Sequence, residues 1–239
     1  MNRAFVSGPV KLEDCSLHAA GQARDSGPAR DSGPARASGA VPELFVVEGE
    51  SAASAVTRVR DVSTQAVLPM QGKPLNTLKA TERKLAAHPL FTALTDSLGT
   101  GRGAACDLAK LRYSRILLLM DPDADGIHCG VLMLMFFHRW MRPVLDAGHV
   151  EIVRPPWGEV VPADGGPPRH AFSEMEFLSL ADAVRAHGPA TARRYRGLAG
   201  IDSRVLLATC VAPATRRSDR ITTAEAAAMI EVFGSLDGF

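Results

Sequence analysis

The sequence has few of the features that anchor or cross-link a chain. Its four cysteines are scattered, with no C-x-x-C pair, which argues against a disulfide framework or a zinc site and favours buried or unused thiols. No apolar run approaches the length of a membrane span, and the N-terminus has no long apolar signal core. We therefore expect a cytoplasmic protein without membrane association.

The sequence also lacks an excess of charge of either sign. Lys and Arg number 27 against 26 Asp and Glu, a net charge of +1. The chain as a whole is therefore no polycation, and any contact with nucleic acid must come from local clustering. With 46% hydrophobic residues among 239, the chain can bury the core of one large domain with an appendage.

The most informative stretch is an apolar run, residues 115–120, that ends in Asp121-Pro-Asp123-Ala-Asp125-Gly. The run predicts a buried, parallel strand, and ligand sites of open α/β sheets lie at the carboxyl ends of such strands. In an extended backbone, alternate side chains share one side, so the three carboxylates are expected to converge. A hard divalent cation such as Mg²⁺ could hold them together.

This acidic stretch has two other interpretations. An EF-hand loop also begins D-x-D-x-D-G, but it needs Glu at the twelfth position, which is Leu132 here, and it follows a helix rather than a strand. A solvated acidic turn is the other alternative, and the stretch alone leaves it open.

A second carboxylate occurs upstream in a similar setting. Residues 43–47 form a short apolar run, Glu48-Gly49-Glu50-Ser51 follows it, and a helix can continue from Ala52. This pattern predicts a strand, a glycine turn and a helix start, with Glu48 at the strand tip.

Together, these segments resemble the TOPRIM domain of the B subunits of bacterial DNA gyrase and topoisomerase IV. Further segments occur in the family's order: residues 65–76 (QAVLPMQGKPLN), 111–113 (LRY), 121–128, 148–156 and 194–198 (RYRGL), the last similar to an Arg-Tyr-Lys-Gly-Leu-Gly element. The resemblance implies an α/β, Rossmann-like fold: a central, mostly parallel sheet flanked by helices, plus a small C-terminal helical tail element.

We divide the chain into four parts. Residues 1–42 are a family-like lead-in followed by a Gly/Pro/Ser/Arg linker with a near-repeat, which we expect to be flexible. Residues 43–160 are the TOPRIM domain, and residues 161–192 are a trimmed connecting segment with a loop at 162–168 and a helix at 177–187. Residues 193–239 are a gyrase-B-like element that ends in an Ala-rich helix. Only seven residues precede Gly8, so we expect the family's ATPase and transducer domains to be absent from this chain.

The resemblance also implies a set of site residues. Glu48, Asp121 and Asp123 would be catalytic and would bind Mg²⁺, with Asp125 on a second or shared ion, so one or two ions are expected. Glu48, or water on its metal, would protonate the departing 3′ oxygen during transesterification of a DNA phosphodiester. Tyr113 and Tyr195 fall at positions where the family has no nucleophile, so the attacking tyrosine must come from a partner.

Five residues are predicted to contact DNA: Lys73, Asn76, His128, Arg194 and Arg196. Asn76 also fits the cap of a helix expected over residues 76–98. Between Arg193 and Arg220, seven Arg stand against two Asp, a surplus that suits phosphate neutralisation. Each of these predictions has an alternative: the arginine-rich stretch can be a solvated charged face, Lys73 a solvated lysine and His128 a structural imidazole.

A glycine-rich stretch, Gly99–Gly103, could suggest a phosphate-binding loop. It lacks the preceding strand and the Lys-Ser/Thr of a P-loop, which favours a connecting loop.

Three functions remain open. The first hypothesis is that the chain is the TOPRIM part of a type IIA DNA topoisomerase, which works with DNA, an A-type subunit and possibly a separate ATPase subunit. Alternatively, it is a decayed paralogue that binds DNA or the A subunit without turnover, since Glu50 and Gln71 replace the family's Asp and Lys. The third hypothesis is an autonomous TOPRIM nuclease.

Overall fold

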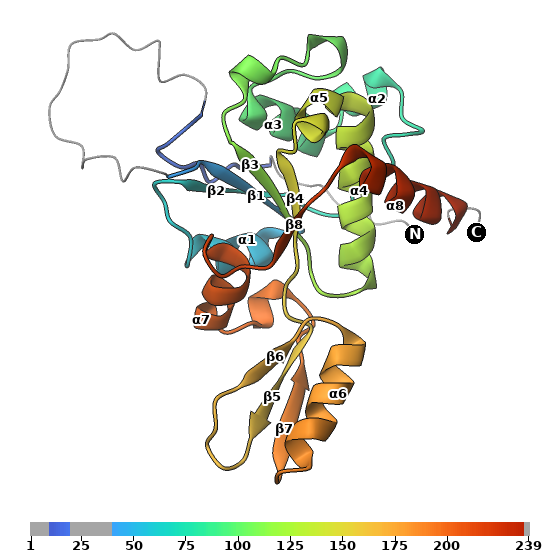
Figure 1. Ribbon diagram of the computed structural model, residues 1–239. Coiled ribbons are helices and arrows are strands. Elements are labelled where there is room, and N and C mark those ends of the chain that lie inside the picture. The colour runs from blue at the N-terminus through green and yellow to red at the C-terminus, as the bar shows by residue number, and fades with distance from the viewer. Residues whose placement is uncertain (1–9, 20–39, 237–239) are drawn as a thin grey trace, which may run out of the picture.

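A five-stranded sheet forms the centre of the computed structural model, which describes residues 10–19 and 40–236 (Figure 1). The strand order is β2-β1-β3-β4-β8; the first four strands are parallel, and β8 is antiparallel to β4. The strands are β1 (Glu43–Val47), β2 (Gln65–Pro69), β3 (Arg115–Leu119), β4 (Val150–Val153) and β8 (Ser218–Arg220). The expected mostly parallel α/β sheet is therefore confirmed.

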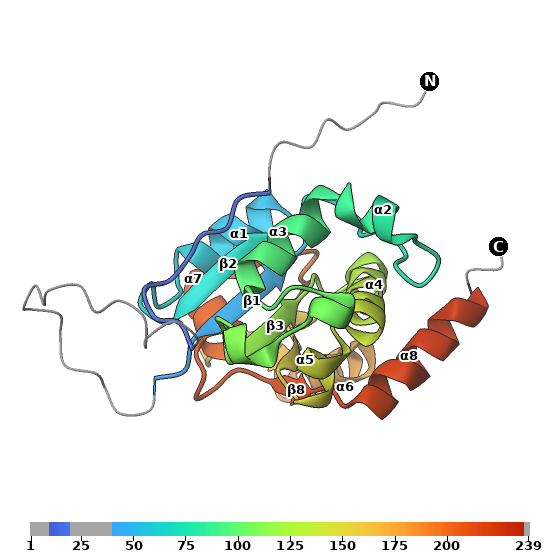
Figure 2. The same ribbon diagram turned by 90° about the horizontal axis from the view of Figure 1, so that it is seen from above.

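Helices cover both faces of this sheet, which explains why its strands are apolar throughout. Along β1, Leu44 and Val46 pack into one core with α3, α4 and α5, whereas Phe45 and Val47 pack into a second core with α1 and α7. Figure 2 shows α8 lying beside α4. The helices are α1 (Glu50–Thr57), α2 (Glu82–Ala86), α3 (Pro89–Leu98), α4 (Ala124–Trp140), α5 (Arg142–Asp146), α6 (Glu174–Arg185), α7 (Ser203–Leu206) and α8 (Thr223–Leu236), with short turns at Gly103–Ala105, Leu108–Lys110, Leu198–Gly200 and Leu207–Val211.

Within the described ranges, no helix combines the length and the apolar character that crossing a membrane requires. The lead-in adds to the sheet instead. Glu13 forms an antiparallel bridge with Val67 of β2 through two backbone hydrogen bonds of 2.9 Å. The expected linker lies largely outside the described residues.

A second, smaller sheet follows β4 and was not predicted. It contains β6 (Arg169–Ala171), β5 (Gly158–Pro162) and β7 (Ala190–Arg194) in that order, all antiparallel, and α6 packs on it. The strands are short, and glycine and proline surround them, so the sequence pattern favoured a loop. The segment expected as a trimmed connection, 161–192, therefore carries strand residues, several of which pair with residues 158–160 just before it. The helix expected at 177–187 is α6.

The single helix expected over residues 76–98 is wrong. Residues 76–81 are a turn, and α2 and α3 are separate helices. Thr81, rather than Asn76, caps α2 by accepting a hydrogen bond from the Lys84 N–H at 3.3 Å. Pro89 begins α3 because a residue before proline, here the extended His88, is disfavoured in helical conformation.

A buried ion pair joins the C-terminal part of the chain to the amino end of the sheet. Glu43, at the start of β1, accepts hydrogen bonds from both terminal nitrogens of Arg216, and both side chains are almost fully buried. Gln65 donates to the same carboxylate at 2.8 Å, and Arg115 lies 3.8 Å from it. Both oxygens of this buried carboxylate therefore accept hydrogen bonds, and its negative charge is balanced by arginine.

We predict that Arg216→Leu will destabilise the protein by about 3 kcal/mol, because removal of one partner leaves a buried charge with too little compensation. Urea unfolding would measure the loss. Arg185→Leu, on the exposed side of α6, is the matched control and should cost under about 0.5 kcal/mol. The double variant Glu43→Gln/Arg216→Leu should recover part of the stability. Equal losses of stability in Arg216→Leu and Arg185→Leu would contradict the prediction.

Candidate metal centre at the strand tips

The pairing of β1 with β3 brings the two predicted acidic segments together. These strands are parallel neighbours in a register that places Val47 opposite Leu119. Glu48 therefore leaves β1 at the edge of the sheet where Asp121 follows β3. Both side chains lie at the carboxyl ends of the strands, where open α/β sheets bind ligands.

Glu48 and Asp121 are close enough for each carboxyl group to affect the ionisation of the other. Burial, followed by the charges of Asp121, Asp123 and Asp125, raises the pKa of Glu48 to about 7. Burial also raises the pKa of Asp121. The two groups therefore hold a proton between them at a pH where isolated carboxyls are ionised.

Asp123 and Asp125 do not continue an extended strand, so the expected alternation along 121–125 is wrong. Helix α4 begins at Ala124, and Asp123 caps it: its Oδ1 accepts the Gly126 N–H at 2.8 Å. Capping bends the chain into a helix directly after Asp123. Asp125 consequently lies exposed in the first helical turn, although its charge still acts on Glu48.

Gly126 makes the tight turn of this motif possible. A Cβ atom at this position would lie 2.1 Å from the backbone oxygen of Asp121. No rotation of a side chain could relieve that clash, because the opposing atom belongs to the backbone. The last residue of the D-x-D-x-D-G pattern is therefore required for the strand to turn into α4.

The structure adds three neighbours that the sequence analysis did not assign to the site. The Leu198 N–H donates to Asp121 Oδ1 at 2.8 Å, and Gly197 lies against the other oxygen of the same carboxylate. Cys129, on α4, is close enough to Glu48 to feel its charge, and burial followed by that charge raises the pKa of the Cys129 thiol to about 12. The RYRGL motif was visible in the sequence, but nothing local to it indicated contact with Asp121.

The residues predicted to contact DNA have different surroundings. Lys73 is exposed, and its charge reaches Cys129. The Asn76 side chain accepts the Leu78 N–H at 3.1 Å. His128 is half-buried with its ring 6.1 Å from that of Phe233. The two arginines are exposed at the end of β7 and beyond it, with the Arg194 guanidinium 4.5 Å from the Trp157 ring.

The strand-tip residues fit a hard divalent cation. The candidate ligands are carboxylate oxygens, which Mg²⁺ and similar ions prefer. Glu48 Oε1 is buried and, among the described residues, has no hydrogen-bond partner. A buried acceptor without a donor is costly, and a bound cation would satisfy it. The donor set and this orphaned oxygen both favour a metal at this edge.

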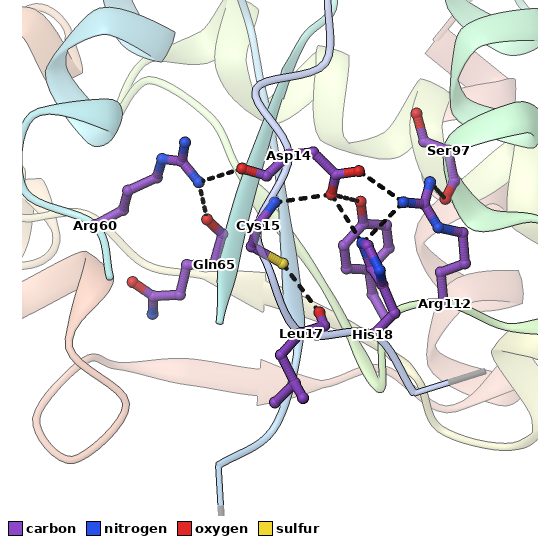
Figure 3. Close-up of polar contacts among 9 residues, drawn as sticks. Asp14, Cys15, Leu17, His18, Arg60, Gln65, Ser97 and Arg112 are labelled. Carbon is purple, nitrogen blue, oxygen red and sulfur yellow. Dashed lines mark hydrogen bonds and ion pairs between the residues drawn. The ribbon is translucent and has the colours of Figure 1, made fainter. Parts of the chain in front are cut away.

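A second group of potential ligands, Asp14, Cys15 and His18, lies in the lead-in (Figure 3), with its ligand atoms within 4.8 Å of one another. Arg112 already occupies this group: its Nη2 lies 2.6 Å from Asp14 Oδ2 and 2.8 Å from His18 Nε2. The Tyr113 hydroxyl also donates to Asp14. A fixed guanidinium repels a second cation, so we interpret this group as a polar clamp that fastens the lead-in to the domain.

A cavity of about 490 Å³ opens away from the acidic centre, between β8 and the start of α6. Its charged side chains have local partners: Arg154 pairs with Asp219, and the Arg217 guanidinium lies 3.7 Å from the Phe172 ring. None of the strand-tip carboxylates lines this cavity.

Comparison with known proteins agrees with this geometry. Residues 43–155 match the family model of the Toprim domain. The matched segment is a Toprim domain. It is also related to the B subunit of DNA gyrase: it is 33% identical over 230 residues to that of Halalkalibacterium halodurans and 35% identical over 234 residues to that of Streptococcus pyogenes, each alignment covering 96% of this chain and 33% of the relative.

A third relative, the DNA gyrase B subunit of Archaeoglobus fulgidus, is 34% identical over 196 residues, which are 82% of this chain and 30% of the relative. The chain thus spans about a third of the length of the curated relatives it matches. Toprim domains bind divalent metal ions, which is the chemistry indicated by the carboxylates after β1 and β3.

We predict that Glu48→Gln will stabilise the metal-free protein above pH 7. The folded-state pKa of Glu48 is raised from 4.5 to about 7, so the folded state binds more protons than the unfolded state within that window. Wild-type stability therefore falls as pH rises through it, whereas the glutamine variant loses nothing there. The half-exposed site is partly screened by water, so we expect a gain on the order of 1 kcal/mol.

Urea unfolding at pH 5 and pH 8 in chelator would measure this difference. Glu231→Gln, an exposed position on α8, is the control and should change stability equally at both pH values. Added Mg²⁺ should favour the wild type over Glu48→Gln. A pH-independent effect of Glu48→Gln would show that the pKa of this carboxyl is not raised in the folded protein.

Proposed function

We propose that this chain supplies the metal-binding half of a type IIA topoisomerase centre that cleaves and religates DNA. The observation that carries the proposal is the Glu48–Asp121 carboxyl pair at neighbouring strand tips of a Toprim domain. The Mg²⁺-dependent reaction would use a tyrosine of a partner A-type subunit.

In this proposal, the carboxylates of Glu48, Asp121 and Asp123 hold Mg²⁺, and Asp125 contributes to a second or shared ion. When bound, Mg²⁺ stabilises charge that develops on the phosphate. Glu48, or water on its metal, would give a proton to the departing 3′ oxygen and recover it on religation. Asp123 also keeps α4 capped, which fixes the approach of Asp125.

Five side chains would contact the DNA backbone or its neighbourhood: Lys73, Asn76, His128, Arg194 and Arg196. Lys73 and Arg196 have the best placement, since Lys73 is exposed near the acidic centre and Arg196 immediately precedes Gly197, which contacts Asp121. Exposed cations beside metal-bound carboxylates would neutralise adjacent phosphates. The Asn76 side-chain oxygen accepts the Leu78 N–H within its own loop.

Neither described tyrosine suits nucleophilic attack. Tyr113 is buried and donates its hydroxyl to Asp14, and Tyr195 is buried and donates to Glu159 at 2.6 Å. Burial, reinforced by these carboxylates, raises the pKa of both phenols. This supports a nucleophile from a partner subunit, and we propose a separately encoded ATPase as a further partner.

One observation favours a binding role without turnover. Glu50 and Gln71, the residues that depart from the family's Asp and Lys, hydrogen-bond each other at 2.9 Å. These two side chains thus bind each other close to the turn after β1. The second candidate is therefore a chain that binds DNA or the A subunit and does not support cleavage.

A cleavage assay with an A-type subunit of a bacterial gyrase separates these functions. We predict Mg²⁺-dependent covalent DNA–protein adducts only when both chains are present, and a loss of at least 100-fold in Glu48→Ala, since oxyanion-type stabilisation and proton transfer each contribute about that much. Glu231→Ala is the matched control.

Complex formation without adduct would favour the binding-only candidate. Mg²⁺-dependent nicking by this chain alone, abolished by Asp121→Asn, would favour an autonomous nuclease. Full cleavage by Glu48→Ala would refute the proposed metal centre.

A further inference from the structure

We infer that the segment Tyr195–Leu198 is a positioning element of the metal centre, which sets the orientation of the Asp121 carboxylate. The inference rests on the proposed metal site. It concerns residues distant in the chain from either acidic motif, and its basis is a set of contacts made by the backbone of this segment rather than by its charged side chains.

The segment is fixed at its first residue by the small sheet. The Tyr195 hydroxyl donates to Glu159 of β5 at 2.6 Å, and the Tyr195 N–H donates to the Trp157 carbonyl at 2.9 Å. Arg193 pairs with the same glutamate at 2.7 Å. Because the hydroxyl and the N–H of this buried tyrosine are both hydrogen-bonded, this end of the segment has little freedom to move.

The last residue of the segment is fixed by the main sheet. Leu198 is fully buried in the core that also contains Val47 and Leu119, the final residues of β1 and β3. These two strands carry Glu48 and Asp121 at their tips. The Leu198 side chain therefore belongs to the same core as the strand ends that position the carboxylates.

Between these anchors, the backbone bonds one oxygen of Asp121 and leaves no room for a side chain beside the other. The Leu198 N–H donates to Oδ1 at 2.8 Å, and a Cβ atom built on Gly197 would lie 2.9 Å from Oδ2. The N–H selects one oxygen, and the close approach of Gly197 limits rotation of the carboxylate. Asp121 is thereby held in one orientation before any ion binds, as preorganised metal ligands require.

The glycine at 197 is required by this contact and not by backbone conformation. Its φ of −175° and ψ of 162° are extended values open to any residue. Gly200, three residues later, provides a comparison, since a Cβ there would meet nothing within 4 Å. A methyl group at 197 must displace the Asp121 carboxylate, whereas the same group at 200 displaces nothing.

The first test compares Gly197→Ala with Gly200→Ala in the full chain by Mn²⁺ binding, measured from the electron paramagnetic resonance signal of free Mn²⁺. Loss of an outer partner of a metal ligand typically weakens metal affinity by about 10–100-fold. We expect at least tenfold weaker binding for Gly197→Ala, unchanged binding for Gly200→Ala and melting temperatures within about 2 °C of wild type for both. Equal Mn²⁺ affinities in the two variants would overturn the inference.

The second test needs no metal and separates this inference from the proposed function. Amide hydrogen exchange at Leu198 should accelerate at least tenfold in Asp121→Ala, which removes the acceptor, and should not change in Asp125→Ala, which removes an exposed carboxylate nearby. Unchanged exchange in Asp121→Ala would overturn the positioning contact. Failure of the wild type to bind Mn²⁺, with accelerated exchange in Asp121→Ala, would instead refute the metal site and retain the contact.

Discussion

Electrostatic repulsion between carboxylates at one edge of the sheet is the constraint on which the site depends. Glu48 and Asp121 are partly buried side by side, with two further aspartates close enough to act on Glu48. Without a counter-charge, this arrangement is unfavourable, and burial together with the neighbouring charges raises the pKa of Glu48. The fold must therefore stabilise the sheet strongly enough elsewhere to keep these groups together.

The two glutamates that bracket β1 show how this is achieved. Glu43, at the amino end, is buried, and Arg216, Gln65 and Arg115 surround it. Glu48, at the carboxyl end, has one oxygen without a partner among the described residues. The same strand thus has a fully compensated carboxylate at one end and an under-compensated one at the other. The first anchors the C-terminal segment to the sheet, and the second is available to a cation.

The sequence predicted those features that depend on local pattern. The apolar runs of β1 and β3 gave the parallel sheet, and their tips gave Glu48 and Asp121. Local alternation failed beyond Asp123, because capping of α4 replaced an extended strand. It also missed β5, β6 and β7, which are short and pair with distant residues. The contact of Gly197 and Leu198 with Asp121 could not be predicted, because it depends on how the second sheet returns the chain to the first.

The path of the chain from the small sheet back to the main sheet has a consequence for the proposed reaction. Arg196 precedes Gly197, and the segment that contains both is anchored to the small sheet by Tyr195 and to the main sheet by Leu198. A cation-binding carboxylate and a phosphate-binding arginine would therefore belong to one rigid unit. In phosphodiester chemistry, a misplacement of about 1 Å can cost about 100-fold in rate. A short segment that touches Asp121 and carries Arg196 would hold the ion and the DNA backbone in a constant relationship, even though the residues involved are far apart in the sequence.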